Sequence, residues 1–170
     1  MVESVGIIAF AFGQQGGKTP VAGPSNEAIS DVTEYIAEKE FELGNDTMVA
    51  AQWETKLGIQ GVDFTASEFN SPTHYISTKD VMDSSLAFFK QQGVYRVIFV
   101  AHPFHLLFIR LLIKADVWKV EDVKIDYQYN KLLRMIPYDR SEGNIQWWTG
   151  NPVTFVTYLV KAQLTKSHGS

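Results

Sequence analysis

The chain has 170 residues, of which 45% are hydrophobic and 20% are charged, and this balance predicts a packed globular domain rather than a disordered segment. It contains no cysteine, which excludes disulfides, thiolate catalysis and cysteine-ligated metal clusters. The net charge of −4 argues against nucleic-acid binding, which needs a basic face.

No segment of the sequence has the roughly 20 apolar residues that a membrane-spanning helix needs. The first apolar run, residues 5–12, is too short for a span or for a secretory signal, and the next, residues 104–113, contains Arg110. We therefore expect a soluble, cytoplasmic protein. It is predicted to have one domain over residues 1–165 and a polar tail over residues 166–170.

Five apolar segments have the length and composition of β-strands. Residues 5–12 and 95–101 are continuous apolar runs, which are typical of strands buried on both faces of a parallel sheet. The shorter candidates are residues 47–51, 61–67 and 123–129.

Four helices are expected to alternate with these strands. They cover residues 26–42, 78–92, 103–114 and 152–164. Ser25 is predicted to cap the first, and Ser77 or Thr78 the second. The last two begin at His-Pro and Asn-Pro pairs, because proline is favoured at the first helical position. The alternation predicts a Rossmann-like three-layer α/β domain, with a mostly parallel sheet and helices on both faces.

Polar segments follow three of the predicted strands. Ligands in open α/β sheets bind beyond the carboxyl ends of the strands, so residues 13–25, 52–55 and 102–105 are expected to converge on one edge. In the first of these, residues 16–19 read Gly-Gly-Lys-Thr, but a phosphate loop would need a glycine where Phe12 stands. The segment is therefore either a flexible connection or a loop that holds a polar ligand.

Two histidines stand at the start of the third helix. His102 is expected at the N-cap and His105 at the third helical position, where the helix dipole disfavours the imidazolium and keeps both rings neutral. Either they act on a ligand together with Glu54, or they only cap the helix. A histidine that faces a cleft would have few packing contacts. Arg110 lies about 140° around the helix from His105 and is expected to form a surface salt bridge.

Taken in order, these segments resemble the YdcF-like (DUF218) family over nearly the whole chain. The resemblance rests on the strand leading to Gly13, the helix that begins at Ser25, the Ser-Thr-Lys-Asp-Val sequence of residues 77–81, and the Phe104-His105 pair. The Ile-Pro-Tyr-Asp sequence of residues 136–139 is also similar to relatives.

The sequence departs from the family at the position three residues after the histidine. The family usually has arginine there, and this chain has Phe108, so Arg110 and Arg134 are candidates to replace it. The resemblance implies a Rossmann-type domain with a small-molecule pocket, and a nucleotide or S-adenosylmethionine as its ligand.

We therefore expect a small-molecule-binding domain, and an enzyme that acts on a nucleotide-like or S-adenosylmethionine-like metabolite by transfer or hydrolysis, with a neutral histidine as acid or base. The expected catalytic residues are His105, His102 and Glu54. The expected ligand-binding residues are Gly13, Gln14, Gln15, Ser25, Gln52, Thr78 and Asp80.

Two alternatives remain open at this point. The first is a metal-assisted hydrolase that uses His102, His105 and Glu54, although no resident metal is the leading expectation. The second is a non-catalytic interaction module that docks a partner through Trp147 and Trp148. The sequence indicates neither the reaction nor the oligomeric state.

Overall fold

A five-stranded parallel sheet forms the centre of the protein. The computed structural model describes residues 2–12, 23–52, 55, 62–64, 77–138, 140 and 149–157. The strands are β1 (Ser4–Ala9), β2 (Asp46–Gln52), β3 (Val62–Phe64), β4 (Arg96–Val100) and β5 (Lys124–Asp126). They pair in the order β3-β2-β1-β4-β5, and every pair is parallel.

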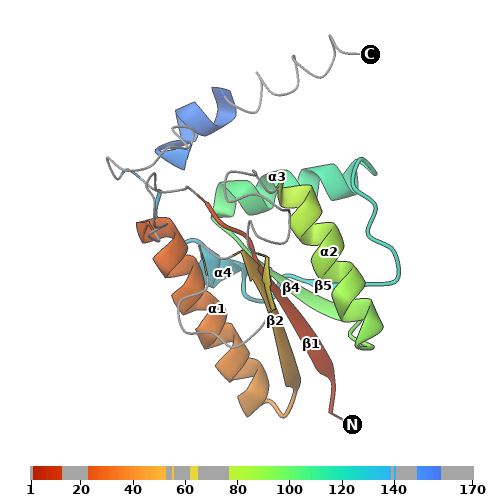
Figure 1. Cartoon of the computed structure of the whole chain (residues 1–170). Helices are drawn as coiled ribbons and strands as arrows, with labels where there is room; N and C mark the ends of the chain where they lie inside the picture. The colour runs from red at the N-terminus through yellow and green to blue at the C-terminus, as the bar shows by residue number, and fades with distance from the viewer. Residues whose placement is uncertain are drawn as a thin grey trace.

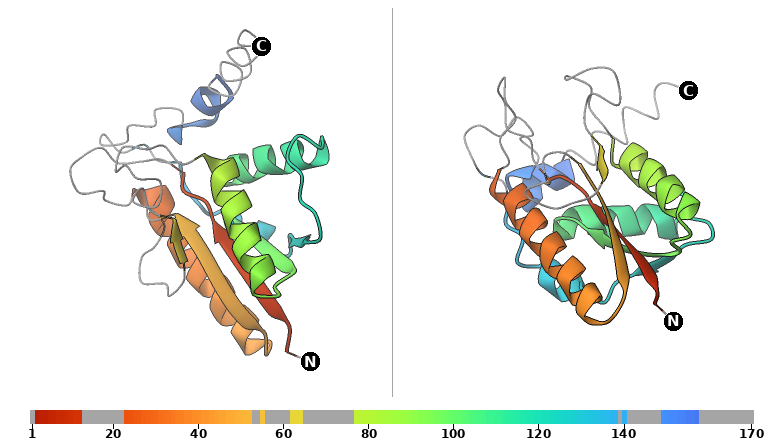
Figure 2. Two further views of the ribbon diagram at one scale, coloured as in Figure 1. Left: turned by 45° about the vertical axis from the view of Figure 1, so that its right-hand side comes forward. Right: turned by 60° about the horizontal axis from the view of Figure 1, so that its bottom comes forward.

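Helices cover both faces of this sheet. They are α1 (Pro24–Glu42), α2 (Thr78–Gln91), α3 (Pro103–Lys114) and the short α4 (Asn130–Leu133). Helices α1 and α4 lie on one side of the sheet, and α2 and α3 lie on the other (Figures 1 and 2). This is the arrangement that right-handed crossovers impose when the strand order reverses direction after β3. The predicted Rossmann-like three-layer fold is confirmed.

The core lies where the central strands meet the helices. β1 is buried from Val5 onward because its apolar side chains face a helix layer on either side. Gly6 leaves room for α2: a Cβ at this position would lie 2.5 Å from the ring of Phe89, which is fully buried. A larger residue at Gly6 would therefore force the helix away from the sheet.

The helix starts show which sequence signals were correct. Ser77 caps α2 in a reciprocal capping box with Asp80, and the imidazole of His102 caps α3, with Nδ1 3.4 Å from the amide nitrogen of Phe104. Asn151 caps the helical residues 152–157 by accepting a hydrogen bond from the Thr154 amide.

The prediction for the first helix start was wrong. The helix α1 begins at Pro24 with Gly23 at its N-cap, so Ser25 lies inside the first turn. The Ser25 hydroxyl does not cap the helix. It donates to the Pro137 carbonyl oxygen at 2.5 Å and ties α1 to a distant segment. The helix α4 also had no counterpart among the predicted elements.

A fully buried carboxylate, Glu40 of α1, organises the amino edge of the sheet. Its oxygens lie 3.1 and 3.2 Å from the guanidinium of Arg96, which also binds Asp126. Glu40 accepts further hydrogen bonds from Asn45, Gln128 and Tyr129 at 2.6 to 2.8 Å. Burial opposes the charge of Arg96, but hydrogen bonds to Asp126 and Glu40 outweigh it and raise its pKa.

No helix in the described part of the chain is long and apolar enough to cross a membrane. Several predictions concern residues outside the described ones. These are the positions Gly13, Gln14, Gln15, Glu54, Trp147 and Trp148, the continuation of the last helix to residue 164, and the tail at 166–170.

Candidate functional site

The candidate site lies at the carboxyl ends of β1 and β4. These two strands are neighbours, and the strand order reverses between them, which is where doubly wound sheets bind their ligands. The first turns of α1, α2 and α3 lie at the same edge (Figure 2). The sequence expectation that distant polar segments follow strands ending on one edge is therefore correct for β1, β2 and β4.

Side chains from neighbouring elements bind the backbone just after β1. The Gln52 side chain, at the end of β2, accepts a hydrogen bond from the Ala11 amide at 2.7 Å. Asn26, in the first turn of α1, accepts one from the Phe12 amide at 2.8 Å. Gln52 was expected to bind a ligand, but its side-chain carbonyl oxygen accepts a hydrogen bond from the protein's own backbone. Asn26 of α1, which the sequence did not single out, makes the equivalent contact with the next backbone amide, that of Phe12.

His105 and Thr78 come together across two helix N-termini. The Nε2 atom of His105 lies 2.8 Å from the Thr78 hydroxyl oxygen, although the residues are 27 positions apart. The His105 side chain is only 9% exposed, and its ring lies about 6 Å from those of Phe10 and Phe12. The expectation of few packing contacts at His105 is therefore wrong, because the aromatic residues that follow β1 enclose the ring.

Both histidines are neutral at pH 7, and burial is the main cause. Burial lowers the pKa of His105 to about 4, with the backbone of Ala11 opposing part of the effect. Burial and the neighbouring His105 lower the pKa of His102 to about 3. The sequence argument predicted neutral rings from the helix dipole. In the folded protein the rings lose their hydration shell, which disfavours the imidazolium more strongly.

His102 is the centre of an aromatic cluster. Its ring stacks on Phe12 with centroids 4.0 Å apart and planes inclined by 7°, and Tyr138 covers it at 4.3 Å with an inclination of 55°. Phe104 and Phe155 lie around these rings. The side chain of His102 is 1% exposed and already caps α3, so the helix-cap interpretation describes its contacts well.

Asp80 and Arg110 also have partners within the protein. The Asp80 carboxylate accepts hydrogen bonds from the amide and hydroxyl of Ser77, and Asp80 itself is exposed. Arg110 lies over the ring of Tyr127, 4.1 Å from its centroid, and pairs with no carboxylate among the described residues. The predicted salt bridge therefore has no partner in the described part of the chain and stays a prediction. A tyrosine brought close by β5 provides a cation–π contact at that position.

Tyr138 is the residue of this region that sequence reasoning passed over. It contacts Phe12, His102 and Phe104, and its hydroxyl is buried without a hydrogen-bond partner among the described residues. The one signal for it was the similarity of residues 136–139 to the YdcF-like family. Spacing could not reveal it, because it lies 36 residues beyond His102 and reaches the site only through the tertiary fold.

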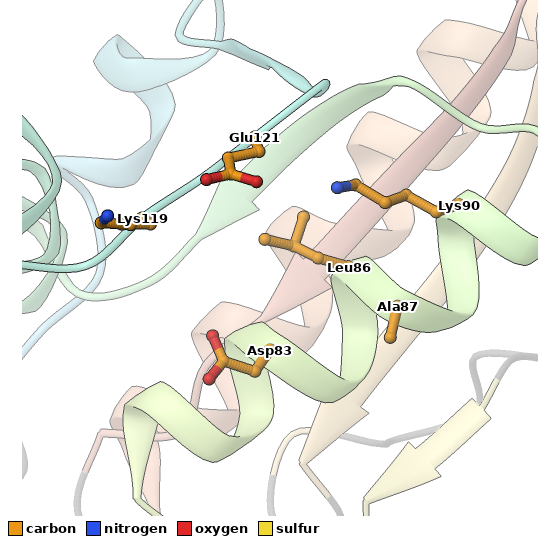
Figure 3. Close-up of a pocket in the computed structure, with 6 residues that line it drawn as sticks. All are labelled: Asp83, Leu86, Ala87, Lys90, Lys119 and Glu121. Carbon is orange, nitrogen blue, oxygen red and sulfur yellow. The ribbon is translucent and has the colours of Figure 1, made fainter.

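A separate shallow groove of about 340 Å³ lies between α2 and residues 119–121 (Figure 3). Its lining combines the side chains of Leu86 and Ala87 with two lysines and two acidic residues, namely Asp83, Lys90, Lys119 and Glu121. Because these charges balance, the groove favours neither an anion nor a cation. None of the expected site residues lines it.

The described residues contain no group of three or more histidine, aspartate or glutamate side chains placed to hold a metal ion. The metal alternative also needs Glu54, which lies outside the described residues. The Nδ1 atom of His102 and the Nε2 atom of His105 already face an amide and a hydroxyl of the protein.

The fold and the site together define a Rossmann-like α/β domain with an aromatic cluster around two neutral histidines at the carboxyl edge of its sheet. Comparison of the chain with protein-family models, with curated proteins and with solved structures finds no match.

Proposed function

We propose that this chain is a cytoplasmic small-molecule-binding enzyme that acts on a nucleotide-like or S-adenosylmethionine-like metabolite at the carboxyl edge of its sheet. The observation that carries the proposal is the Thr78–His105 pair, with its 2.8 Å contact, at the point where the strand order reverses. The resemblance to the YdcF-like family supports the same class of ligand.

A packing role alone does not account for a histidine at position 105. Apolar rings surround it, and an apolar side chain of similar size would avoid the cost of burying two ring nitrogens. Thr78 is half-buried and connects the imidazole to the surface through its hydroxyl. A ligand at the edge of the sheet would therefore reach the Thr78 hydroxyl and the imidazole behind it.

The lowered pKa limits what His105 does in the free protein. With a pKa of about 4, holding a proton on the imidazole at pH 7 costs about 4 kcal/mol. His105 therefore serves as a neutral hydrogen-bonding group until a ligand binds. An anionic group bound beside it would raise its pKa toward neutrality and make it an effective acid or base for transfer or hydrolysis.

A thermal-shift screen with adenosine monophosphate, S-adenosylmethionine and divalent metals tests the proposal. A ligand at 100 times its Kd stabilises the folded state by roughly 2.7 kcal/mol, which gives a shift of several degrees. For a ligand found in this way, we expect His105→Gln to weaken binding by about tenfold or more, since a neutral hydrogen bond in a buried site contributes about 1.5 kcal/mol.

Lys114→Gln is the matched control, because Lys114 is exposed at the far end of the same helix. It should leave affinity unchanged. If His105→Gln lowers the melting temperature but keeps full affinity, His105 has only a structural role and the proposal fails. The absence of any shift with the nucleotide and S-adenosylmethionine would also contradict it.

A further inference from the structure

Two buried side-chain polar atoms have no hydrogen-bond partner in the described part of the chain, and both belong to the candidate site. They are the hydroxyl of Tyr138 and Nδ1 of His105, although the Ala11 backbone lies close enough to the imidazole to oppose part of the fall in its pKa. Leaving a buried polar atom unpaired costs about 1–3 kcal/mol, so each such atom needs an explanation. Both residues contact the ring of Phe12, at centroid distances of 6.1 Å.

Phe12 and Tyr138 pack against the His102 ring in different ways, and their own centroids are only 6.1 Å apart, so they do not lie on opposite faces of that ring. Phe12 lies parallel to one face, at 4.0 Å and 7°. Tyr138 covers the ring at 4.3 Å with an inclination of 55°, which is neither a stacked nor an edge-on arrangement. Aromatic pairs gain most in offset-stacked or edge-to-face geometry, so Tyr138 fills this position without the best contact.

The backbone beside Tyr138 is fixed, but the side chain is not fully enclosed. Ile136 is 3% exposed, and the Pro137 carbonyl accepts the hydrogen bond from Ser25. Tyr138 itself is half-buried, and its hydroxyl would give up no hydrogen bond to any residue that the structure describes. Rotation about its side-chain bonds would therefore move its ring away from His102 while Ile136 and Pro137 stay in place.

We propose that Tyr138 is an aromatic lid, and that a flat, uncharged heteroaromatic ring such as a nucleobase displaces it and packs in its place against His102 and Phe12. This inference rests on the proposed function and assigns the place where the base of a nucleotide-like ligand lies. The polar edge of a base would offer hydrogen bonds to the Tyr138 hydroxyl, which has no partner among the described residues in the closed position.

The charge of the cluster favours a neutral ring at this position. Its members are aromatic side chains and two histidines that burial keeps unprotonated. A phosphate in the place of Tyr138, beside His102, would lose its hydration without meeting a cation, whereas a base would exchange water for ring contacts.

Calorimetric titration with adenosine and with ribose 5-phosphate tests the lid on the full chain and two variants. In Tyr138→Phe the closed lid no longer buries an unpaired hydroxyl, so displacing it costs more. We expect about tenfold weaker adenosine binding and a higher melting temperature. In Tyr138→Ala no ring has to be displaced, and we expect adenosine to bind severalfold more tightly.

Tyr95→Phe and Tyr95→Ala are the matched controls, because Tyr95 is 54% exposed at the opposite edge of the sheet. They should not change adenosine binding. Ribose 5-phosphate has no base, so its affinity should be the same in the Tyr138 variants and in the parent chain. If Tyr138→Ala does not fold, Tyr138→Leu removes the aromatic ring while keeping an apolar side chain in place.

The outcomes separate the two proposals. Opposite changes in the Tyr138→Phe and Tyr138→Ala variants support the lid. Equal adenosine affinity in all of the chains, or weaker binding in both Tyr138 variants, overturns it. Binding of ribose 5-phosphate that depends on His105, without any binding of adenosine, would overturn the lid and leave the proposed function standing. If neither probe binds, both proposals fail for nucleotide-like ligands.

Discussion

The two edges of the sheet handle buried polar groups in opposite ways. At the amino edge, Glu40 is fully buried yet charged, and donors from Arg96, Asn45, Gln128 and Tyr129 surround its two oxygens. At the carboxyl edge, the buried titratable groups of the described residues are neutral histidines, and Nδ1 of His105 has at best a poorly aligned contact with the Ala11 backbone among those residues.

The amino edge therefore contributes to stability, and the carboxyl edge is the one at which we propose ligand binding. A buried charge persists only when its partners replace its hydration, and the Glu40 network does so completely by joining α1, β4, β5 and the turn before α4. Such a network has no free group to offer a ligand. The carboxyl edge tolerates unpaired atoms, which is typical of regions where binding is favoured over stability.

The largest predicted effect lies at the amino edge. Glu40→Gln keeps the shape of the side chain but removes the charge and places an amide donor against other donors. We expect the free energy of unfolding to fall by about 3–5 kcal/mol, since one partner of a buried ion pair is lost. Urea unfolding monitored by circular dichroism measures this change.

Glu3 provides the control for this substitution, because it binds the same guanidinium at 3.1 Å but is 55% exposed. Glu3→Gln should cost less than about 1 kcal/mol. Comparable losses in both variants would show that the buried network does not differ from a surface ion pair, and the contrast between the two edges would disappear.

The second prediction concerns acid sensitivity and belongs to the carboxyl edge. His102 and His105 have folded-state pKa values of about 3 and 4, against 6.5 for the free side chain. As the pH falls below 6.5, the unfolded chain binds protons that the folded chain does not. Stability is therefore complete above pH 6.5. It falls between pH 6.5 and 4 by about 1.4 kcal/mol per pH unit for each histidine.

Urea unfolding at a series of pH values measures this slope. His102→Asn keeps a capping side chain and removes one imidazole, so it should reduce the slope by about half. Asp126 does not contribute to this slope, because its pKa lies below 3.8 and it titrates at lower pH. Its hydrogen bonds lower the pKa by more than burial raises it. If the stability of His102→Asn has the same pH dependence as that of the parent chain, the His102 ring binds protons in the folded state as it does in the unfolded state.

The smallest predicted effect concerns the contact between α2 and α3. Thr78→Val keeps the shape of the side chain and removes the hydroxyl that faces His105. We expect the free energy of unfolding, measured by urea unfolding, to fall by about 1 kcal/mol. Thr78→Ser keeps the hydroxyl and should restore the affinity for ligand that Thr78→Val loses. If valine binds ligand as well as serine does, the hydroxyl does not take part in recognition.

Local signals in the sequence identified much of the candidate site but not its contacts. Proline after His102 predicted the start of α3, and Ser77 or Thr78 as a cap predicted the start of α2, because capping depends on neighbours within one turn. The same reasoning failed at Ser25. Its hydroxyl binds the carbonyl of Pro137, 112 residues away, and no local pattern carries that information.

The sequence by itself determined the layered fold. Continuous apolar runs in β1 and β4 can be buried only between two helix layers, and the chain provides an amphipathic helix after each. Only the tertiary structure decided which polar groups meet. It brought Thr78 to His105 and Arg96 to Glu40, and it placed Tyr138 on His102. These contacts depend on strand order and on the path of the chain after β5, and the burial that lowers the two histidine pKa values exists only once those elements have packed.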